Sequence, residues 1–207
     1  MKKRKIILFG GSFDPVHNGH IAVVSAAADY IGADEVIFIP AKQSPHKANS
    51  PYASDEDRLQ MVTLALSCDH RFRISECEIQ RRGPSYTLDT IRFFNENYGS
   101  EAEFYWLAGA DCLADLPNWY RISDLIDEFN LCIMYRGGFE PPKFGQLLGY
   151  FGEQRVKKLE NNVIPTPLID ISSSDIRRLL AQNLPVEGKL PEAVLDYILK
   201  QGLYRRA

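Results

Sequence analysis

The chain has 207 residues, of which 45% are hydrophobic and 25% charged, and its formal net charge is -3 at pH 7. This length allows one sizeable core, and the composition fits neither a disordered nor a membrane-embedded protein. The small net charge excludes a bulk attraction to nucleic acid, although a local cationic pocket is compatible with it. We therefore predict one domain over residues 1–207, with neither nucleic acid nor membrane as a partner.

Two features bear on the compartment. The basic start Met1–Lys5 is followed by only four apolar residues, Ile6–Phe9, a run too short for the apolar region of a signal peptide. The four cysteines form no C-x-x-C pair and lie in regular segments, which favours reduced thiols over a disulfide frame or a zinc site. We expect a cytoplasmic protein without a metal held by its own side chains. The cysteines are Cys68, Cys77, Cys112 and Cys132.

Short apolar runs alternate with helical patterns along the chain. The runs are nearly continuous in Ile, Val, Leu and Phe, which is typical of parallel strands buried on both faces. The sequence therefore predicts an α/β fold of the Rossmann-like, doubly wound kind, with a mainly parallel sheet and flanking helices. Strands are expected at residues 5–9, 35–40, 71–75, 104–108 and 130–135, with a weaker one at 163–164 or 168–171.

The helical segments are bounded by recognisable turn and cap residues. Gly202 is expected to end the last helix in a left-handed conformation. The segment 137–152 is rich in Gly, Pro and Phe and lacks a period, so we predict a loop there. Helices are expected at residues 21–31, 56–66, 87–97, 175–181 and 193–201.

The strongest functional signal is the segment GGSFDPVHNGH, residues 10–20, between the first predicted strand and the first predicted helix. Ligands of open α/β sheets collect at the carboxyl ends of strands, where helix N-termini present N–H groups to anions. Gly10 and Gly11 permit a close backbone approach. His17 and His20, three residues apart, can both face a phosphate group and donate N–H bonds to it. A tight turn with incidental histidines is the alternative, and neither a dinucleotide fingerprint nor a Walker loop fits.

Residues 11–20 resemble the G-x-F-D-P-x-H-x-G-H signature of the histidine-motif nucleotidyltransferases. A later segment, ISSSDIR at residues 171–177, is similar to their I-S-S-T-x-I-R motif, with Ser174 where threonine is common. Both residue types can cap a helix and bond to phosphate. The resemblance implies that residues 171–207 complete an ATP site. The implied ATP-binding residues are Gly10, Gly11, Ser12, Phe13, His17, His20, Asp111, Ile171, Ser173, Ser174 and Arg177.

Intermediate segments resemble the branch that acts on pyridine mononucleotides, the nicotinate-nucleotide adenylyltransferases of the bacterial type, and this resemblance covers almost the whole chain. The segment SPHK at 44–47 is similar to a loop whose lysine meets phosphates. PSYT at 84–87 is similar to the segment that holds the pyridine ring, although Ser85 or Thr87 could also serve as a helix cap. LPNWY at 116–120 is similar to the segment whose tryptophan stacks on nicotinate; a core tryptophan is the alternative.

The remaining assignments also follow from the resemblance. Gly109-Ala110-Asp111 matches a family element whose acid faces the nucleotide cleft, and capping of the next helix is its alternative role. Arg136 would lie at the same cleft edge, where an ordinary strand-end charge is also expected. The implied catalytic residues are His17, His20, Lys47 and Arg177, and the implied substrate-binding residues are Lys47, Thr87, Trp119, Tyr120 and Arg136.

The implied reaction is adenylyl transfer from ATP to nicotinate mononucleotide, giving deamido-NAD and pyrophosphate in NAD biosynthesis. Mg²⁺ would be bound through the ATP phosphates. One alternative is a phosphopantetheine adenylyltransferase or cytidylyltransferase, in which the matches at 85–87 and Trp119 are not expected. Another is a regulatory module that binds NAD-like ligands without turnover, which does not need so many cations at a triphosphate. The oligomeric state stays open, and a homo-oligomer is compatible with the sequence.

Overall fold

The computed structural model describes residues 3–43, 50–136 and 140–205, with the side chains of Cys68 and Arg136 left out of that description. These residues contain a six-stranded sheet in the order β3-β2-β1-β4-β5-β6, and all neighbouring strands are parallel. The strands are β1 (Arg4–Gly11), β2 (Glu35–Pro40), β3 (Phe72–Ile74), β4 (Ala102–Gly109), β5 (Asn130–Arg136) and β6 (Val163–Thr166).

The central strand β1 explains why the sheet needs a helical layer on each face. Ile6 and Leu8 belong to one buried cluster, whereas Ile7 and Phe9 belong to the other, because successive side chains of a strand point to opposite faces. β1 pairs with both β2 and β4, so the direction in which strands are added reverses between β1 and β4. Such a switch point opens a crevice at the carboxyl ends of the strands.

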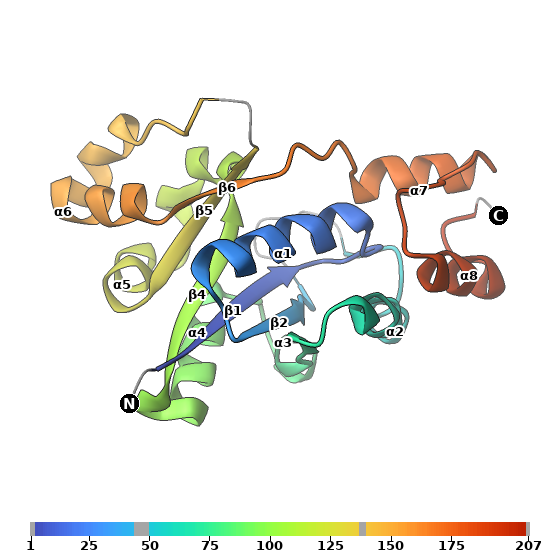
Figure 1. Cartoon of the computed structure of the whole chain (residues 1–207), viewed down its shortest axis with the longest axis horizontal. Coiled ribbons are helices and arrows are strands. Elements are labelled where there is room, and N and C mark those ends of the chain that lie inside the picture. The colour runs from blue at the N-terminus through green and yellow to red at the C-terminus, as the bar shows by residue number, and fades with distance from the viewer. Residues whose placement is uncertain (1–2, 44–49, 137–139, 206–207) are drawn as a thin grey trace.

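The helices form two layers, and Figure 1 shows α1 lying in front of β1. One layer contributes to the core cluster around Ile7 and consists of α1 (Asn18–Ile31), α2 (Asp55–Ala65), α7 (Ser173–Ala181) and α8 (Glu192–Gln201). The other contributes to the cluster around Ile6 and consists of α4 (Thr87–Tyr98), α5 (Ile122–Glu128) and α6 (Leu148–Asn161). The predicted doubly wound α/β fold is confirmed.

Shorter helical turns join these elements. The short helix α3 (Cys77–Gln80) follows β3, and the described part of the chain also contains five 3-10 turns between longer elements. Those turns are η1 (Leu66–Cys68), η2 (Gly99–Glu101), η3 (Ala110–Ala114), η4 (Leu116–Asn118) and η5 (Gly145–Leu147).

The predicted boundaries differ most from the structure in three places. The weaker strand lies at 163–166 and not at 168–171. α1 begins at Asn18, earlier than expected, because His17 caps it. The prediction of a loop over 137–152 is wrong from Gly145 onward, where η5 and then α6 begin. Gly152 interrupts α6 with φ 72° and ψ 170°. The buried residues of α6 therefore do not follow one continuous helical period in the sequence.

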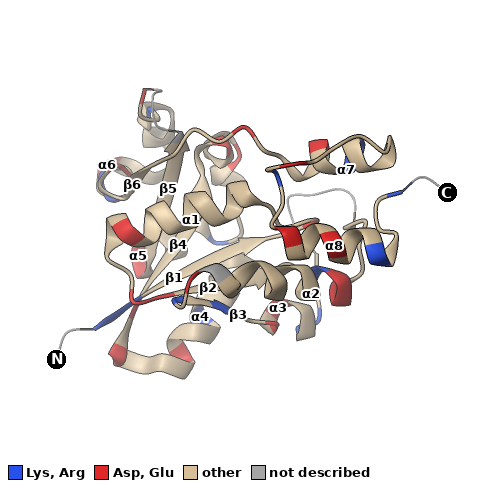
Figure 2. Ribbon diagram, turned by 45° about the vertical axis from the view of Figure 1, so that its right-hand side comes forward, with Lys and Arg blue, Asp and Glu red and all other residues tan. Residues whose placement is uncertain are grey.

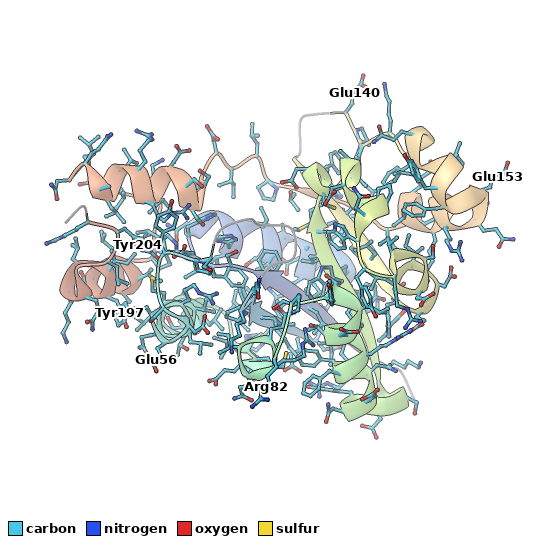
Figure 3. All side chains as sticks on the ribbon, turned by 180° about the vertical axis from the view of Figure 1, so that it is seen from behind. Glu56, Arg82, Glu140, Glu153, Tyr197 and Tyr204 are labelled. Atoms are coloured by element: carbon cyan, nitrogen blue, oxygen red, sulfur yellow. The ribbon has the colours of Figure 1, made fainter. Side chains whose placement is uncertain are left out.

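The two ends of the molecule carry different elements. Figure 3 shows Glu140 and Glu153 on the side of α6, and Tyr197 and Tyr204 at the opposite end. Acidic and basic positions are mixed along the helices, as α8 illustrates in Figure 2. None of the helices in the described part of the chain is both long and apolar enough to cross a membrane.

Candidate active site

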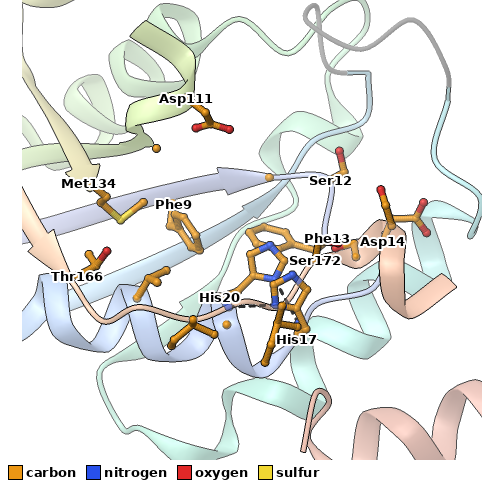
Figure 4. A pocket seen from close by; sticks show the side chains of 18 of the residues that line it. Phe9, Ser12, Phe13, Asp14, His17, His20, Asp111, Met134, Thr166 and Ser172 are labelled. Carbon is orange, nitrogen blue, oxygen red and sulfur yellow. Dashed lines mark hydrogen bonds between the residues drawn. The ribbon is translucent and has the colours of Figure 1, made fainter. Parts of the chain in front are cut away.

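A cleft of about 1210 Å³ opens at the switch point between β1 and β4. Its walls come from the ends of β1 and β4, the first turns of α1 and α7, and the segments that follow β2, β5 and β6. Figure 4 shows His17 and His20 together on one wall and Asp111 across from them. Every predicted ATP-binding residue lines this cleft: Gly10, Gly11, Ser12, Phe13, His17, His20, Asp111, Ile171, Ser173, Ser174 and Arg177.

The two histidines cap the first turn of α1 reciprocally. His17 is the N-cap, and its Nδ1 accepts a hydrogen bond of 3.2 Å from the backbone N–H of His20. The Nδ1 of His20 accepts one of 3.2 Å from the backbone N–H of His17. The rings stack with centroids 3.6 Å apart. This capping box satisfies two N–H groups that a helix start leaves unpaired, and it fixes both imidazoles against the cleft.

The same contacts determine where each neutral ring carries its proton. A nitrogen that accepts from an N–H group cannot itself be protonated, so the neutral form of each ring carries its hydrogen on Nε2. Burial lowers the pKa of His17 to about 4, and its side chain is therefore uncharged at neutral pH. An Nε2–H group on an uncharged ring is a hydrogen-bond donor suited to a phosphate oxygen.

Residues 10–17, here called the phosphate loop, are held by hydrogen bonds from distant elements. The fully buried Arg58 of α2 donates from Nη1 to the carbonyl oxygen of Ser12 at 2.7 Å. Ser173 of α7 donates from Oγ to the carbonyl oxygen of Pro15 at 2.9 Å. Asn18 donates from its backbone N–H to the carbonyl oxygen of Lys189 at 2.9 Å. Arg58 thus joins the loop to α2, whereas the bonds of Ser173 and Asn18 join the loop and the start of α1 to the C-terminal part of the chain.

Two glycines of the cleft are required by close packing. A Cβ atom on Gly10 would lie 2.6 Å from the ring of Trp106, and one on Gly11 would lie 3.0 Å from the ring of Phe13. Phe13 itself has a positive φ of 46°, an uncommon conformation for a residue with a side chain. The backbone therefore runs directly along the cleft wall, where its N–H groups can approach an anion.

The first turn of α7 supplies another part of the wall, next to the phosphate loop. Ser172 is the N-cap, accepting from the N–H of Asp175, so the expected capping role belongs to Ser172 and not to Ser174. Arg177 donates to the Oγ of Ser174 at 3.2 Å and to the carbonyl oxygen of Asp14 at 2.6 Å. The first turns of α1 and α7 thus both line the cleft with their partial positive charge.

Among the described side chains, the predicted pyridine-binding residues Thr87, Trp119 and Tyr120 lie outside the lining of this cleft. Thr87 is the first residue of α4, and Trp119 is half-buried directly after η4. The Tyr86 and Tyr120 rings stack with centroids 4.4 Å apart, which brings the start of α4 and the end of η4 together. These two segments are here called the group beside the cleft, and their role in binding the pyridine ring stays a prediction.

A buried polar network supports the start of α4. Thr90 donates from Oγ1 to Glu78 at 2.6 Å, and Arg81 donates to the same Oγ1 at 2.9 Å. Burial raises the pKa of Glu78 above its ordinary value. The expected cap by Ser85 or Thr87 is wrong, because Tyr86 occupies the N-cap position and makes no side-chain cap bond. The alternative capping role of Asp111 is also wrong, since Gly109 occupies that position in η3.

Two predicted residues cannot be placed. Lys47 lies outside the described residues, and only the backbone of Arg136, the last residue of β5, is described. The sequence reasoning also missed cleft residues, because their positions depend on the fold and they stand outside the resembling motifs. These are Tyr52, Met134, Tyr135, Thr166 and Ile169. Ser172, the N-cap of α7, was also missed, although it lies within the segment 171–177.

Comparisons with known proteins agree with this geometry. The cytidylyltransferase-like family model matches residues 8–179. A protein of Neisseria meningitidis serogroup C named "Probable nicotinate-nucleotide adenylyltransferase" is 39% identical over 209 residues, covering 98% of this chain and 100% of that protein. A protein of the same name from Gloeobacter violaceus is 40% identical over 201 residues, covering 95% and 94% of the two chains.

A solved structure supports the fold. The nicotinic acid mononucleotide adenylyltransferase of Plasmodium falciparum, complexed with NaAD, superimposes with a TM-score of 0.74 at 22% identity, over 97% of each chain. At that identity the likeness concerns the fold alone. The family model and the full-length relatives carry the assignment, and on that basis this chain belongs to the nicotinate-nucleotide adenylyltransferases within the cytidylyltransferase-like family.

Proposed function

We propose that this chain transfers the adenylyl group of ATP to nicotinate mononucleotide. The phosphate oxygen of the mononucleotide attacks the α-phosphorus of ATP, the bond from that phosphorus to the bridging oxygen breaks, and pyrophosphate leaves with deamido-NAD as the other product. A phosphate is already a competent nucleophile, so the protein has to align two anions and stabilise the charge that develops on the transferred and leaving oxygens.

The observation that carries this proposal is the stacked and reciprocally capped pair His17 and His20. Both rings are held before any ligand arrives, and both neutral forms present a proton on Nε2. Donors fixed in advance stabilise a transition state without the cost of reorganisation. We assign these two Nε2–H groups to oxygens around the α-phosphate.

Positive charge for the β- and γ-phosphates comes from other groups. Arg177 lines the cleft from α7, beside the hydroxyl groups of Ser173 and Ser174. The partial charges of the two helix N-termini add to it. We assign Arg177 and Lys47 to these phosphates, and we assign residues 171–207 the role of completing the ATP site.

Mg²⁺ fits the residues present as an ion carried by the triphosphate. Among the described residues no three His, Cys, Asp or Glu side chains form a metal-binding group, whereas Asp111 exposes one carboxylate in the cleft. Magnesium keeps several waters and is commonly bound through one or two carboxylates and substrate phosphates. When bound, it would neutralise phosphate charge, with Asp111 contacting its water shell or the ribose hydroxyls of ATP.

We assign the group beside the cleft, at the start of α4 and directly after η4, to the pyridine half of nicotinate mononucleotide. Trp119 offers a flat face for stacking on the ring, and Thr87 offers a hydroxyl at the N-terminus of α4, where a carboxylate is favoured. Tyr120 and Arg136 complete the proposed set. The stack of Tyr86 on Tyr120 supports this assignment because it fixes the spacing of the two segments.

The test is pyrophosphate release from ATP and Mg²⁺, measured separately with nicotinate mononucleotide, nicotinamide mononucleotide and phosphopantetheine. Release with the nicotinate substrate is the expected result. Pyrophosphate release with phosphopantetheine alone would overturn the substrate assignment but leave the assignment of adenylyl transfer intact. No release with any of the three acceptors would favour a module that binds nucleotides without turnover.

A further inference from the structure

We infer that Tyr204, near the C-terminus, is a positioning residue for the ATP site: its hydroxyl group holds the side chain of Asp14, and Asp14 in turn holds Arg177. This inference rests on the proposed function, because it takes Arg177 to be a ligand of the ATP phosphates. The three residues lie far apart in the sequence, and the phenol and the carboxylate that it contacts are separated by 190 positions.

The C-terminal turn directs Tyr204 into the protein. α8 ends at Gly202, whose φ is 65°, and Tyr204 follows with a positive φ of 62°. A positive φ is uncommon for a residue with a bulky side chain, and such conformations persist where the surrounding contacts determine them. Tyr204 donates from Oη to Oδ1 of Asp14 at 2.7 Å, and its Oη also lies 4.0 Å from the sulfur of Met61 in α2.

The phenol is a permanent donor at this position. Burial and the adjacent carboxylate of Asp14 raise the pKa of Tyr204 well above its ordinary value. The hydroxyl group therefore stays protonated across the physiological range. The Asp14 carboxylate is only 4% exposed, so it depends on donors from the protein rather than on water.

Three donors determine the position of Asp14. Besides the Tyr204 hydroxyl, the backbone N–H of Ala53 donates to Oδ1 at 3.1 Å and that of Tyr52 donates to Oδ2 at 2.8 Å. Neutral groups supply these three hydrogen bonds, and Arg177 Nη1 lies 3.9 Å from Oδ2. The side chain of Asp14 is therefore placed to hold the loop rather than to bind substrate.

Because its side chain is held in place, the backbone of Asp14 also fixes the position of Arg177. Its carbonyl oxygen accepts the 2.6 Å bond from Arg177 Nη1, while the guanidinium carbon of Arg177 lies 4.5 Å from the centroid of the Tyr52 ring. Asp14 fixes both partners of that contact, since it also binds the N–H of Tyr52. The Tyr204 hydroxyl group thus fixes, through Asp14, the position of the Arg177 guanidinium in the cleft.

Loss of the hydroxyl group should weaken ATP binding specifically. In Tyr204→Phe the ring remains, but one buried carboxylate lone pair loses its donor, and the Asp14 backbone is free to shift. We expect the Kd of ATP, titrated by calorimetry without the second substrate, to rise about fivefold. The KM for ATP should rise by a similar factor while the KM for nicotinate mononucleotide stays within about twofold of wild type.

The chain offers a matched control in Tyr197→Phe. Tyr197 donates from Oη to Asp57 Oδ1 at 2.8 Å between α8 and α2, at the same end of the molecule as Tyr204 (Figure 3). Its partner Asp57 lies outside the lining of the cleft, whereas Asp14, the partner of Tyr204, belongs to it. Both variants lose one phenol-to-carboxylate hydrogen bond. Only Tyr204→Phe should change the Kd of ATP.

Three results would overturn the inference. They are an unchanged Kd in Tyr204→Phe, an equal loss in both variants, or a loss in Tyr204→Phe that affects the two substrates equally. Thermal melting of each variant shows whether a weaker Kd reflects unfolding, and ATP titration below the melting temperature keeps the comparison valid. Failure of the wild type itself to bind ATP would instead count against the proposed function.

Discussion

The ATP end of the proposed site, around His17, His20 and Arg177, is held differently from the pyridine end, around Thr87, Trp119 and Tyr120. At the ATP end, helix caps and hydrogen bonds to backbone carbonyls fix the side chains, and all the predicted residues that are described line one cleft. At the pyridine end, half-buried or exposed aromatic rings come from the segment directly after η4 and from the start of α4.

This difference follows from the work that each end is proposed to do. Donors that stabilise developing charge must be in place before the reaction, whereas a flat apolar surface can adapt as it binds a ring. We therefore expect loss of a preorganised histidine donor at the ATP end to lower kcat, and loss of the flat surface at the pyridine end to raise the KM for nicotinate mononucleotide.

The largest effect is expected for His20→Ala. Removing one preorganised donor should lower kcat by roughly 10²–10³-fold, while circular dichroism shows a folded chain. His70→Ala is the matched control, because the His70 side chain is 95% exposed and outside the cleft lining. A His20→Ala enzyme with wild-type turnover would remove the histidine pair from the mechanism.

Gly10→Ala tests whether the phosphate loop tolerates added volume. The new Cβ would lie 2.6 Å from the buried Trp106 ring, and such overpacking should lower the free energy of unfolding by about 1–3 kcal/mol. Gly149→Ala is the control, since no atom lies within 4 Å of its added Cβ and it should be close to neutral. Urea denaturation measures the free energy of unfolding of both variants. Equal values would show that the phosphate loop shifts to accommodate the added methyl group.

The buried His17 should make stability depend on pH. Its pKa is about 4 in the folded chain, below the ordinary 6.5, so the unfolded chain binds more protons between these values. Stability is therefore lost as the pH falls from about 6.5 toward 4. His17→Asn keeps an N-cap acceptor but does not titrate. Between pH 7.5 and pH 5, the free energy of unfolding should therefore fall by about 2 kcal/mol more in the wild type than in the variant.

Urea denaturation of both proteins at the two pH values gives this difference directly. All other titrating groups are shared, so their contributions cancel in the comparison. Equal losses in the two proteins would mean that His17 is hydrated in solution, and that its ring is not preorganised as the mechanism requires.

Sequence patterns predicted the fold well where burial dominates and poorly where local conformation dominates. The apolar runs that became β1, β2 and β5 have two buried faces, and their bounds were predicted within two residues. α6 was missed because Gly149 and Gly152 lie in its first turns, and the latter breaks its period. Its helical state depends on core packing, which a single sequence does not reveal.

The same limit applies to the site. The spacing of His17 and His20 indicated that both could face a phosphate, but not that each ring caps the other residue's backbone. Asp14 stood in the recognised segment, yet its bond with Tyr204 spans nearly the whole chain. Local motifs predicted the residue types at the ATP end, whereas the contacts that fix those residues required the fold.

At the pyridine end, Trp119→Ala is expected to have a smaller effect than the variants of His20, Gly10 and His17. Loss of the flat apolar face should raise the KM for nicotinate mononucleotide about tenfold, since stacking on an aromatic ring adds roughly 0.5–1.5 kcal/mol to the burial of its surface. The KM for ATP and the value of kcat should change less than twofold, because the ATP end keeps its own caps and hydrogen bonds. Trp119→Phe, which retains a ring, should recover most of the affinity. A fall in kcat instead of a rise in KM would show that the two ends are coupled, and the contrast between a rigid ATP end and an adaptable pyridine end would then be wrong.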